Sequence, residues 1–256
     1  MKLIDRFADT GSFLFRWRSY VPLLLLPALV ASFSGPRYRV DSAAALLAWE
    51  AACLAVALIG LAVRVVTVGT APRGTSGRNT RAQKAEVLNT TGLYSILRHP
   101  LYVGNALIAL GVAALSRTWY LPLIVALAAL LYYERIAACE ERYLEGKFGD
   151  EFRRWADRVP AMIPTFRGYR PPALPFNWRV VLGREFYAFS IITTLFSVLH
   201  LVDRYAVTGR VALDPESTVL FLLGLGAFVV LRALKKSGRL RRAETGASRR
   251  ADLPVA

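Results

Sequence analysis

The chain has 256 residues, of which 55% are hydrophobic, and it carries a formal net charge of +15. Its apolar residues fall into blocks with the charged residues between them, a segregation that excludes an ordinary soluble domain and indicates a multi-pass membrane protein. The basic residues lack the clustering and motif support of a nucleic-acid-binding face, so we expect no nucleic-acid partner.

Six apolar segments follow one another along the chain, and each is predicted to be a transmembrane helix. The third and fourth are shorter than the ~20 residues that a perpendicular helix needs to cross a bilayer. Only Arg117 and Thr118 lie in the connector between them, so these two segments are expected to form a tight helical hairpin. The six segments are 20–34, 43–66, 101–116, 119–134, 186–202 and 217–234. The predicted fold is an all-α polytopic membrane protein with about six transmembrane helices.

The basic residues test this topology independently. Of the 33 Lys and Arg residues, 28 lie in alternate polar regions or at the segment edges next to them, with both termini included, and five lie in the remaining connectors. The positive-inside rule predicts this alternation for six spans with both termini in the cytoplasm. An Ala- and Arg-rich composition further indicates a bacterial protein, which places it in the cytoplasmic membrane.

The same blocks divide the chain into four expected parts. An N-terminal pair of transmembrane helices (1–66) precedes a core (67–170) that contains a polar loop, the hairpin and an amphipathic helix. A second pair of transmembrane helices follows in 171–234, after a Pro-rich connector. The basic tail, 235–256, is expected to be disordered and held near anionic head groups by its charge.

The region 67–99 includes a basic stretch rich in turn residues, "RGTSGRNT". Backbone N–H groups in such stretches can hold an anion. A solvated loop whose arginines only set the topology explains the same composition. The candidate acceptor-binding residues of this loop are Arg73, Arg78, Asn79 and Arg81.

Several polar residues stand directly before the third apolar segment, in "RHPLYVG". Pro100 suits the first turn of a helix, so Arg98 and His99 are expected at its N-terminus, with Tyr102 one turn further on. Gly104 removes a side chain where another helix or a ligand can approach closely. Interfacial anchoring and helix capping would explain any one of these residues. Four of them within seven positions indicate a binding site.

The segment 132–166 alternates apolar and charged residues at helical spacing, and it is predicted to be an amphipathic helix at the cytoplasmic interface. Glu140 and Glu141 lie near the exit of the hairpin, where carboxylates are unfavourable unless they have partners. The alternative is a solvated face paired with nearby arginines. If the hairpin folds back, both its ends meet at one level, which brings His99 and Tyr102 near the two carboxylates.

Together these motifs resemble those of a known family. "GLYSILRHPLYVGN" (92–105) and "EERYLEGKFGDEFRRWADRVPAMIP" (140–164) fit the patterns G-x-Y-x-x-x-R-H-P-x-Y-x-G, E-E-x-x-L-x-x-x-F-G-x-x-[YF] and V-P-x-x-x-P. These patterns are similar to those of the membrane-embedded methyltransferases, which include isoprenylcysteine carboxyl methyltransferases and phospholipid N-methyltransferases. The resemblance covers about residues 85–166. Trp155 departs from the pattern, since many members have Tyr there.

The resemblance implies S-adenosylmethionine (AdoMet) as the methyl donor, bound between the R-H-P-x-Y turn and the E-E helix. It implies that Arg98, His99 and Glu141 are catalytic residues. The implied cofactor-binding residues are Tyr94, Arg98, His99, Tyr102, Gly104, Glu140 and Glu141. Their chemistry suits AdoMet, because arginine binds a carboxylate, a tyrosine ring binds a cation, and a carboxylate accepts from hydroxyl or ammonium groups. Orientation and desolvation can drive the transfer, and no set of metal ligands is visible, so we expect no metal.

The acceptor is expected to be a lipid or lipidated molecule that reaches the site sideways from the bilayer. A prenylcysteine carboxylate, an ethanolamine-type amine and a phosphate-bearing head group all remain open. The arginines of the 67–99 loop favour O-methylation of an anionic group. The alternatives are a phospholipid ethanolamine N-methyltransferase and a non-catalytic membrane scaffold or transport protein. The last would have lost the cofactor residues, all of which are present.

Overall fold

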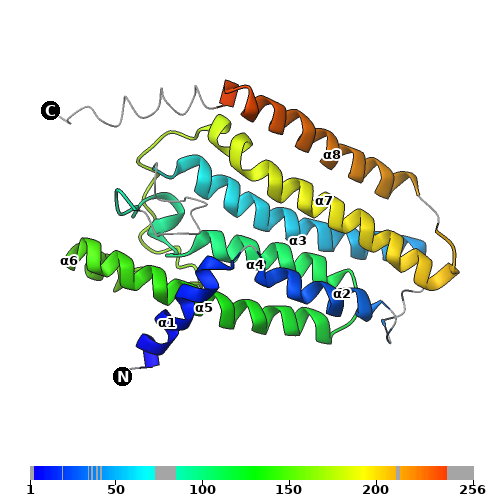
Figure 1. The fold of residues 1–256 in the computed structure, drawn as a ribbon, viewed down its shortest axis with the longest axis horizontal. Coiled ribbons are helices and arrows are strands. Elements are labelled where there is room, and N and C mark those ends of the chain that lie inside the picture. Colours follow the sequence, from blue (N-terminus) through cyan, green and yellow to red (C-terminus); the bar gives the residue numbers. More distant parts are fainter. Residues whose placement is uncertain are drawn as a thin grey trace.

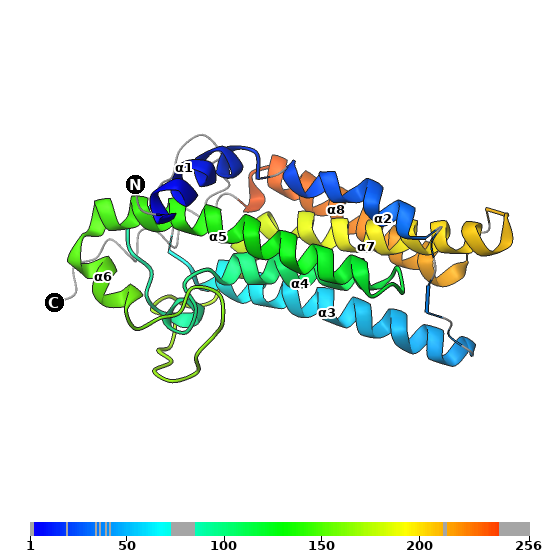
Figure 2. The same ribbon diagram turned by 90° about the horizontal axis from the view of Figure 1, so that it is seen from below.

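The computed structural model describes residues 3–18, 20–33, 35, 37, 38, 40, 42–72, 85–211 and 214–240. Within them every regular element is helical, which confirms the all-α prediction. The longer helices run side by side along one axis (Figures 1 and 2). In chain order the elements are α1 (Leu3–Arg16), η1 (Val21–Leu25), α2 (Leu26–Ser32), α3 (Ala43–Thr70), η2 (Gly92–Ser95), α4 (Pro100–Ala114), α5 (Tyr120–Phe148), α6 (Asp150–Ala156), α7 (Trp178–Thr208) and α8 (Pro215–Lys236).

Each of the six predicted segments contains helix, but not all of them are long enough to span a membrane. Helices α3, α5, α7 and α8 are long and apolar enough. A fifth span is counted only if Asp9–Arg16 and Val21–Ser32, which meet at 84°, form one broken span. Helix α4 has 15 residues, about 22 Å at the rise of an α-helix, against a hydrocarbon core of about 30 Å. The described structure therefore supports four or five spans, and the predicted count of six is not confirmed.

Glycines let α3 and α4 approach each other closely. A Cβ atom at Gly104 would lie 2.8 Å from the carbonyl oxygen of Gly60, and one at Gly111 would lie 2.6 Å from that of Cys53. Both distances are too short for real side chains, so only glycine permits this backbone contact. The main apolar core lies beside this helix pair, where α2, α5 and α7 also meet. Its fully buried members include Ala57, Leu121 and Ile192.

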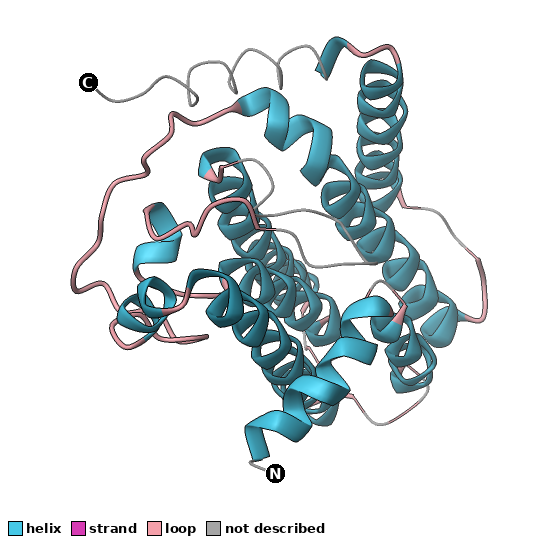
Figure 3. Cartoon of the chain, turned by 60° about the vertical axis from the view of Figure 1, so that its left-hand side comes forward, coloured by secondary structure: helices cyan, strands magenta, loops and turns pink. Residues whose placement is uncertain are grey.

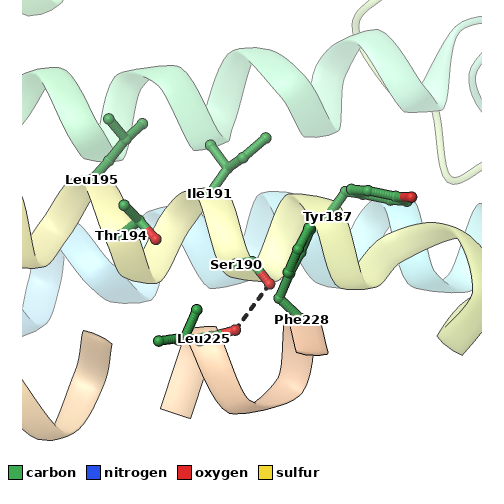
Figure 4. Close-up of a pocket in the computed structure, with 8 residues that line it drawn as sticks. Tyr187, Ser190, Ile191, Thr194, Leu195, Leu225 and Phe228 are labelled. Atoms are coloured by element: carbon green, nitrogen blue, oxygen red, sulfur yellow. Dashed lines mark hydrogen bonds between the residues drawn. The ribbon is translucent and has the colours of Figure 1, made fainter. Parts of the chain in front are cut away.

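Helices α7 and α8 pack along their length as the last pair (Figure 1). The Ser190 hydroxyl donates to the carbonyl oxygen of Phe186 at 2.8 Å and also lies 3.1 Å from that of Gly224 on α8. Figure 4 shows an apolar groove of about 350 Å³ beside this contact, lined by residues that include Tyr187, Leu195 and Phe228.

The structure corrects the prediction of a separate amphipathic helix over 132–166. Helix α5 continues without a break from the hairpin to Phe148, because no proline or glycine lies between Pro122 in its first turn and Gly146 in its last. Gly149, at φ +53°, ends it, and only the short α6 follows. Residues 157–177 contain no helix, and prolines within them oppose one. Helix α1 lies across α5 instead of running with the bundle (Figures 1 and 3).

The bundle has two distinct ends. We call one the α6 end, where α3 ends, α4 begins and α5 leads into α6 (Figure 1). The opposite end carries the α4–α5 turn and is tied together by ionic contacts. Asp203 pairs there with Arg37 and Arg117, the latter at 2.8 Å. His200 lies between Glu50, at 3.2 Å, and Asp214, at 3.1 Å.

Candidate functional site

The hairpin brings its two polar motifs together at the α6 end. Arg117, a non-glycine residue at φ +56°, lies in the turn that sends α5 back along α4. His99 Nε2 consequently lies 2.8 Å from Glu141 Oε1, and His99 Nδ1 lies 3.7 Å from Glu140 Oε2. The imidazole is buried, with 6% of its side chain exposed, whereas the two carboxylates are 26% and 23% exposed. The buried imidazole of His99 therefore lies between two carboxylates that are partly exposed to solvent.

Arg98 extends this cluster. Its Nη1 donates to the carbonyl oxygen of Ala156 at 3.2 Å, and its Nε lies 3.2 Å from Glu141 Oε1. The second contact satisfies the distance of an ion pair but not the geometry of a hydrogen bond, because Nε is a buried nitrogen without a hydrogen-bond partner. Buried donors are nearly always bonded, so this one marks a place where an acceptor is missing.

Three rings form a stack beside the carboxylates. The Tyr102 ring lies over His99 with a centroid distance of 5.4 Å, and over Tyr133 of α5 with one of 4.8 Å. The Tyr102 hydroxyl lies beside Glu140. The stack joins the first turn of α4 to α5, and it forms an aromatic wall next to the acidic pair.

Tyr94 lies in η2, close to the same pair. Burial, and then the negative charge of Glu140, raise the pKa of its phenol well above the ordinary value, so the phenol stays protonated and can donate a hydrogen bond. The Trp155 Nε1 donates to the carbonyl oxygen of Tyr94 at 3.0 Å. Tyrosine, which many family members have at position 155, can also donate to a carbonyl, so the departure at Trp155 preserves this type of contact.

The backbone of the R-H-P turn is held by the V-P-x-x-x-P segment. The Arg98 N–H donates to the carbonyl oxygen of Pro160 at 2.9 Å, and the His99 N–H donates to that of Ala161 at 3.1 Å. These two N–H groups precede α4 and would otherwise need other acceptors. The third motif therefore fixes the position from which both functional side chains project.

A second polar cluster lies inside the bundle, next to the aromatic wall. Arg64 of α3 forms two contacts with Glu185 of α7, at 2.7 and 2.9 Å, and it donates to Asn105 of α4 at 2.5 Å. The Tyr133 hydroxyl lies beside Asn105. The sequence motifs did not indicate Arg64 or Glu185. The signal that could have found them is a charge within or at the edge of an apolar segment, since such charges require partners.

The sequence-predicted residues thus divide into three groups. Arg98, His99, Tyr102, Glu140 and Glu141 come together, with Tyr94 next to them. Gly104 faces α3, so the group that approaches it closely is another helix. The candidate acceptor-binding residues, Arg73, Arg78, Asn79 and Arg81, lie outside the described residues.

Residues 49–151 match the phospholipid methyltransferase family, an interval that contains both polar motifs. The chain is 29% identical to the cobalt-zinc-cadmium resistance protein CzcN of Cupriavidus metallidurans, over 59% of this chain and 73% of that protein. It is 34% identical to the nickel-cobalt-cadmium resistance protein NccN of Alcaligenes xylosoxydans xylosoxydans, over 48% of this chain and 57% of that protein. No solved structure matches the chain significantly.

A third relative is the protein-S-isoprenylcysteine O-methyltransferase of Schizosaccharomyces pombe, 33% identical over 33% of this chain and 36% of that enzyme. The apolar helices and these matches define an integral, multi-pass membrane protein with a polar site at one end of its bundle. Less than half of the chain, residues 49–151, is therefore similar to the membrane methyltransferases, which include phospholipid methyltransferases and isoprenylcysteine O-methyltransferases.

Proposed function

We propose that this protein transfers the methyl group of AdoMet to a lipid or lipidated acceptor at the α6 end, on the cytoplasmic face of the membrane. The observation that carries the proposal is the buried Arg98 Nε, which has no hydrogen-bond partner. It lies beside Glu140 and Glu141, two carboxylates that are partly exposed to solvent. A negatively charged group of a ligand would satisfy this donor. A carboxylate pair in the same cluster would hold a positively charged or hydroxyl-bearing part of the same ligand.

The residues present fit AdoMet. Arg98 would bind its carboxylate, and Glu140 and Glu141 would accept from its ammonium or ribose hydroxyl groups. The Tyr102 ring is stacked between His99 and Tyr133 and therefore fixed in orientation, so it would meet the ligand with its edge and with the hydroxyl beside Glu140. When bound, AdoMet supplies a methyl group on a positively charged sulfur that is already activated for displacement.

The side chains of the site would act mainly by orientation and by excluding water. His99 is fixed by Glu141, by the ring of Tyr102 and by its own backbone contact with Ala161. It can hold a proton between the two carboxylates. A carboxylate or phosphate acceptor needs no proton removed before methylation. An ammonium acceptor does, and the His99–Glu141 pair is placed to take that proton.

We propose an anionic oxygen as the acceptor, and therefore O-methylation. The relatives named as O-methyltransferases support this assignment, as do Arg73, Arg78 and Arg81 of the sequence. A phospholipid amine is the second candidate, favoured by the acidic pair at the site and by the name of the matching family. Two relatives are named for metal resistance. Among the described residues no group of three or more His, Cys, Asp or Glu side chains is placed to hold a metal. The proposed reaction uses no metal ion.

The test uses AdoMet labelled in its methyl group, membranes that contain the protein, and a total lipid extract. We expect label to enter the lipid fraction with the wild type, and to fall to background with His99→Ala and Glu141→Ala. Mild base then separates the two acceptors, because a carboxyl methyl ester releases volatile methanol whereas an N-methyl amine keeps its label. Equal incorporation by the wild type and both variants would refute methyl transfer at this site.

A further inference from the structure

A separate hollow opens at the α6 end, and neither Glu140 nor Glu141 lines it. It encloses about 360 Å³ between η2, α6 and the segment 167–170. Seven of its ten lining residues are polar or charged, and four of these are arginines. The residues on which the following argument rests are Ser95, Arg154, Trp155, Arg158, Arg167 and Arg170. We call this feature the arginine hollow.

Its walls are held by hydrogen bonds of the backbone. The Arg170 N–H donates to the Ser95 hydroxyl at 3.0 Å, and the Gly92 N–H donates to the carbonyl oxygen of Arg170 at 3.0 Å. On the facing wall Arg158 Nε donates to the carbonyl oxygen of Arg154 at 2.9 Å. These hydrogen bonds hold two separate segments of the chain in place, and arginines of both segments line the same hollow.

The charge of the hollow is unbalanced. Four arginines line it together with one carboxylate, Glu151, and none of the four has an acidic partner among the described residues. The neighbouring Arg153 differs, because it pairs with Glu145 at 2.9 Å and with Asp150 at 3.0 Å. Like charges gathered in one concave space repel each other and favour a bound anion. Helix α6 thus carries one paired arginine, Arg153, outside the hollow and one unpaired arginine, Arg154, that lines it, and Arg158 follows just after the helix ends.

We propose that the arginine hollow binds a phosphate group. Guanidinium groups bind phosphate oxygens through two parallel hydrogen bonds, a geometry that lysine cannot supply. The volume lies within the range of small-molecule sites, so the hollow can hold a phosphate with part of the molecule that carries it. Two sources present this chemistry at the end of a membrane bundle, namely the head group of an anionic phospholipid and a phosphate compound dissolved in the cytosol.

The experiment uses the full chain in phosphatidylcholine nanodiscs and compares three proteins. These are the wild type, the double variant Arg154→Gln/Arg158→Gln, and the control Arg153→Gln, which removes a charge from α6 directly beside Arg154 but not from the hollow. All three positions are exposed, so each variant should fold, which equal melting temperatures in chloride would verify. In the first arm inorganic phosphate is titrated by calorimetry against chloride at constant ionic strength. In the second arm no inorganic phosphate is added, and the nanodiscs contain some phosphatidic acid. Native mass spectrometry then counts the phosphatidic acid molecules that each protein retains.

We expect the double variant to bind phosphate at least about tenfold more weakly than the wild type, the loss expected for one or more charge-assisted hydrogen bonds. Arg153→Gln should bind as the wild type does. Such a difference in the first arm identifies a soluble phosphate compound, and the same difference in lipid retention in the second arm identifies a head group. The proposal is overturned if neither arm distinguishes the double variant from the control, because the arginines of the hollow would then bind phosphate no better than an arginine outside it.

Discussion

Glu141 contacts two basic side chains through one oxygen atom. Its Oε1 lies 2.8 Å from His99 Nε2 and 3.2 Å from Arg98 Nε, but only the first contact is a hydrogen bond. A guanidinium carries five N–H donors in a rigid plane. Arg98 can therefore bond the carbonyl oxygen of Ala156, stay close to Glu141 and still offer a donor to a ligand. A lysine at this position would have one mobile ammonium group for all three partners.

Replacing Arg98 by Lys should therefore impair the enzyme although it conserves the charge. We expect the Michaelis constant for AdoMet to rise by roughly tenfold to a hundredfold, since a lost hydrogen bond to a charged group costs about 1.5–3 kcal/mol. Steady-state kinetics with AdoMet varied at a saturating acceptor concentration would measure this. Arg153→Lys, at an exposed position on α6, is the control and should leave the constant unchanged. A change confined to the acceptor's Michaelis constant would assign Arg98 to the acceptor instead.

Helix α7 lies outside the region that matches the family, yet an ion pair inside the bundle joins it to that region. Arg64 and Glu185 have 15% and 5% of their side chains exposed, and Asn105 accepts a further hydrogen bond from Arg64. A pair this buried contributes little over an apolar contact, but removal of one member leaves the other charge without compensation. The pair therefore makes the position of α7 against α3 specific.

Glu185→Ala should destabilise the folded bundle by about 3 kcal/mol, the lower end of the range for breaking a buried ion pair. The control is Glu216→Ala, an acidic residue in the first turn of α8 that is exposed and should have little effect. Unfolding in mixed detergent micelles, followed by circular dichroism, would compare both variants with the wild type. If they lost the same stability, Glu185 would not anchor α7.

At the scale of the whole molecule, local patterns predicted the convergence of the candidate residues better than they predicted the packing of the helices. The convergence of His99 with Glu141 could be predicted, because a hairpin with a short connector returns its two ends to one level. The contact of Arg64 with Glu185 could not, since 121 residues separate them and helical periodicity does not specify which helices become neighbours. The count of six spans is not confirmed, because apolar composition identified α4 as a helix but does not determine its length, which is 15 residues.

The arrangement of the bundle also bears on topology. Helix α1 and the end of α8 lie at the α6 end, the end that carries the candidate site, whereas the link between α7 and α8 lies at the other (Figure 1). Most of the Lys and Arg residues in the described part of the chain lie towards the α6 end, and the positive-inside rule places such regions in the cytoplasm. Green fluorescent protein fused after Leu240 should therefore fluoresce, and alkaline phosphatase fused there should be inactive. The same two reporters inserted at Gly209, in the α7–α8 link, should give the opposite pattern, because they would be exported. An active phosphatase after Leu240 would place the α6 end outside the cytoplasm, where AdoMet is not supplied, and would contradict both the topology and the proposed direction from which AdoMet reaches Arg98.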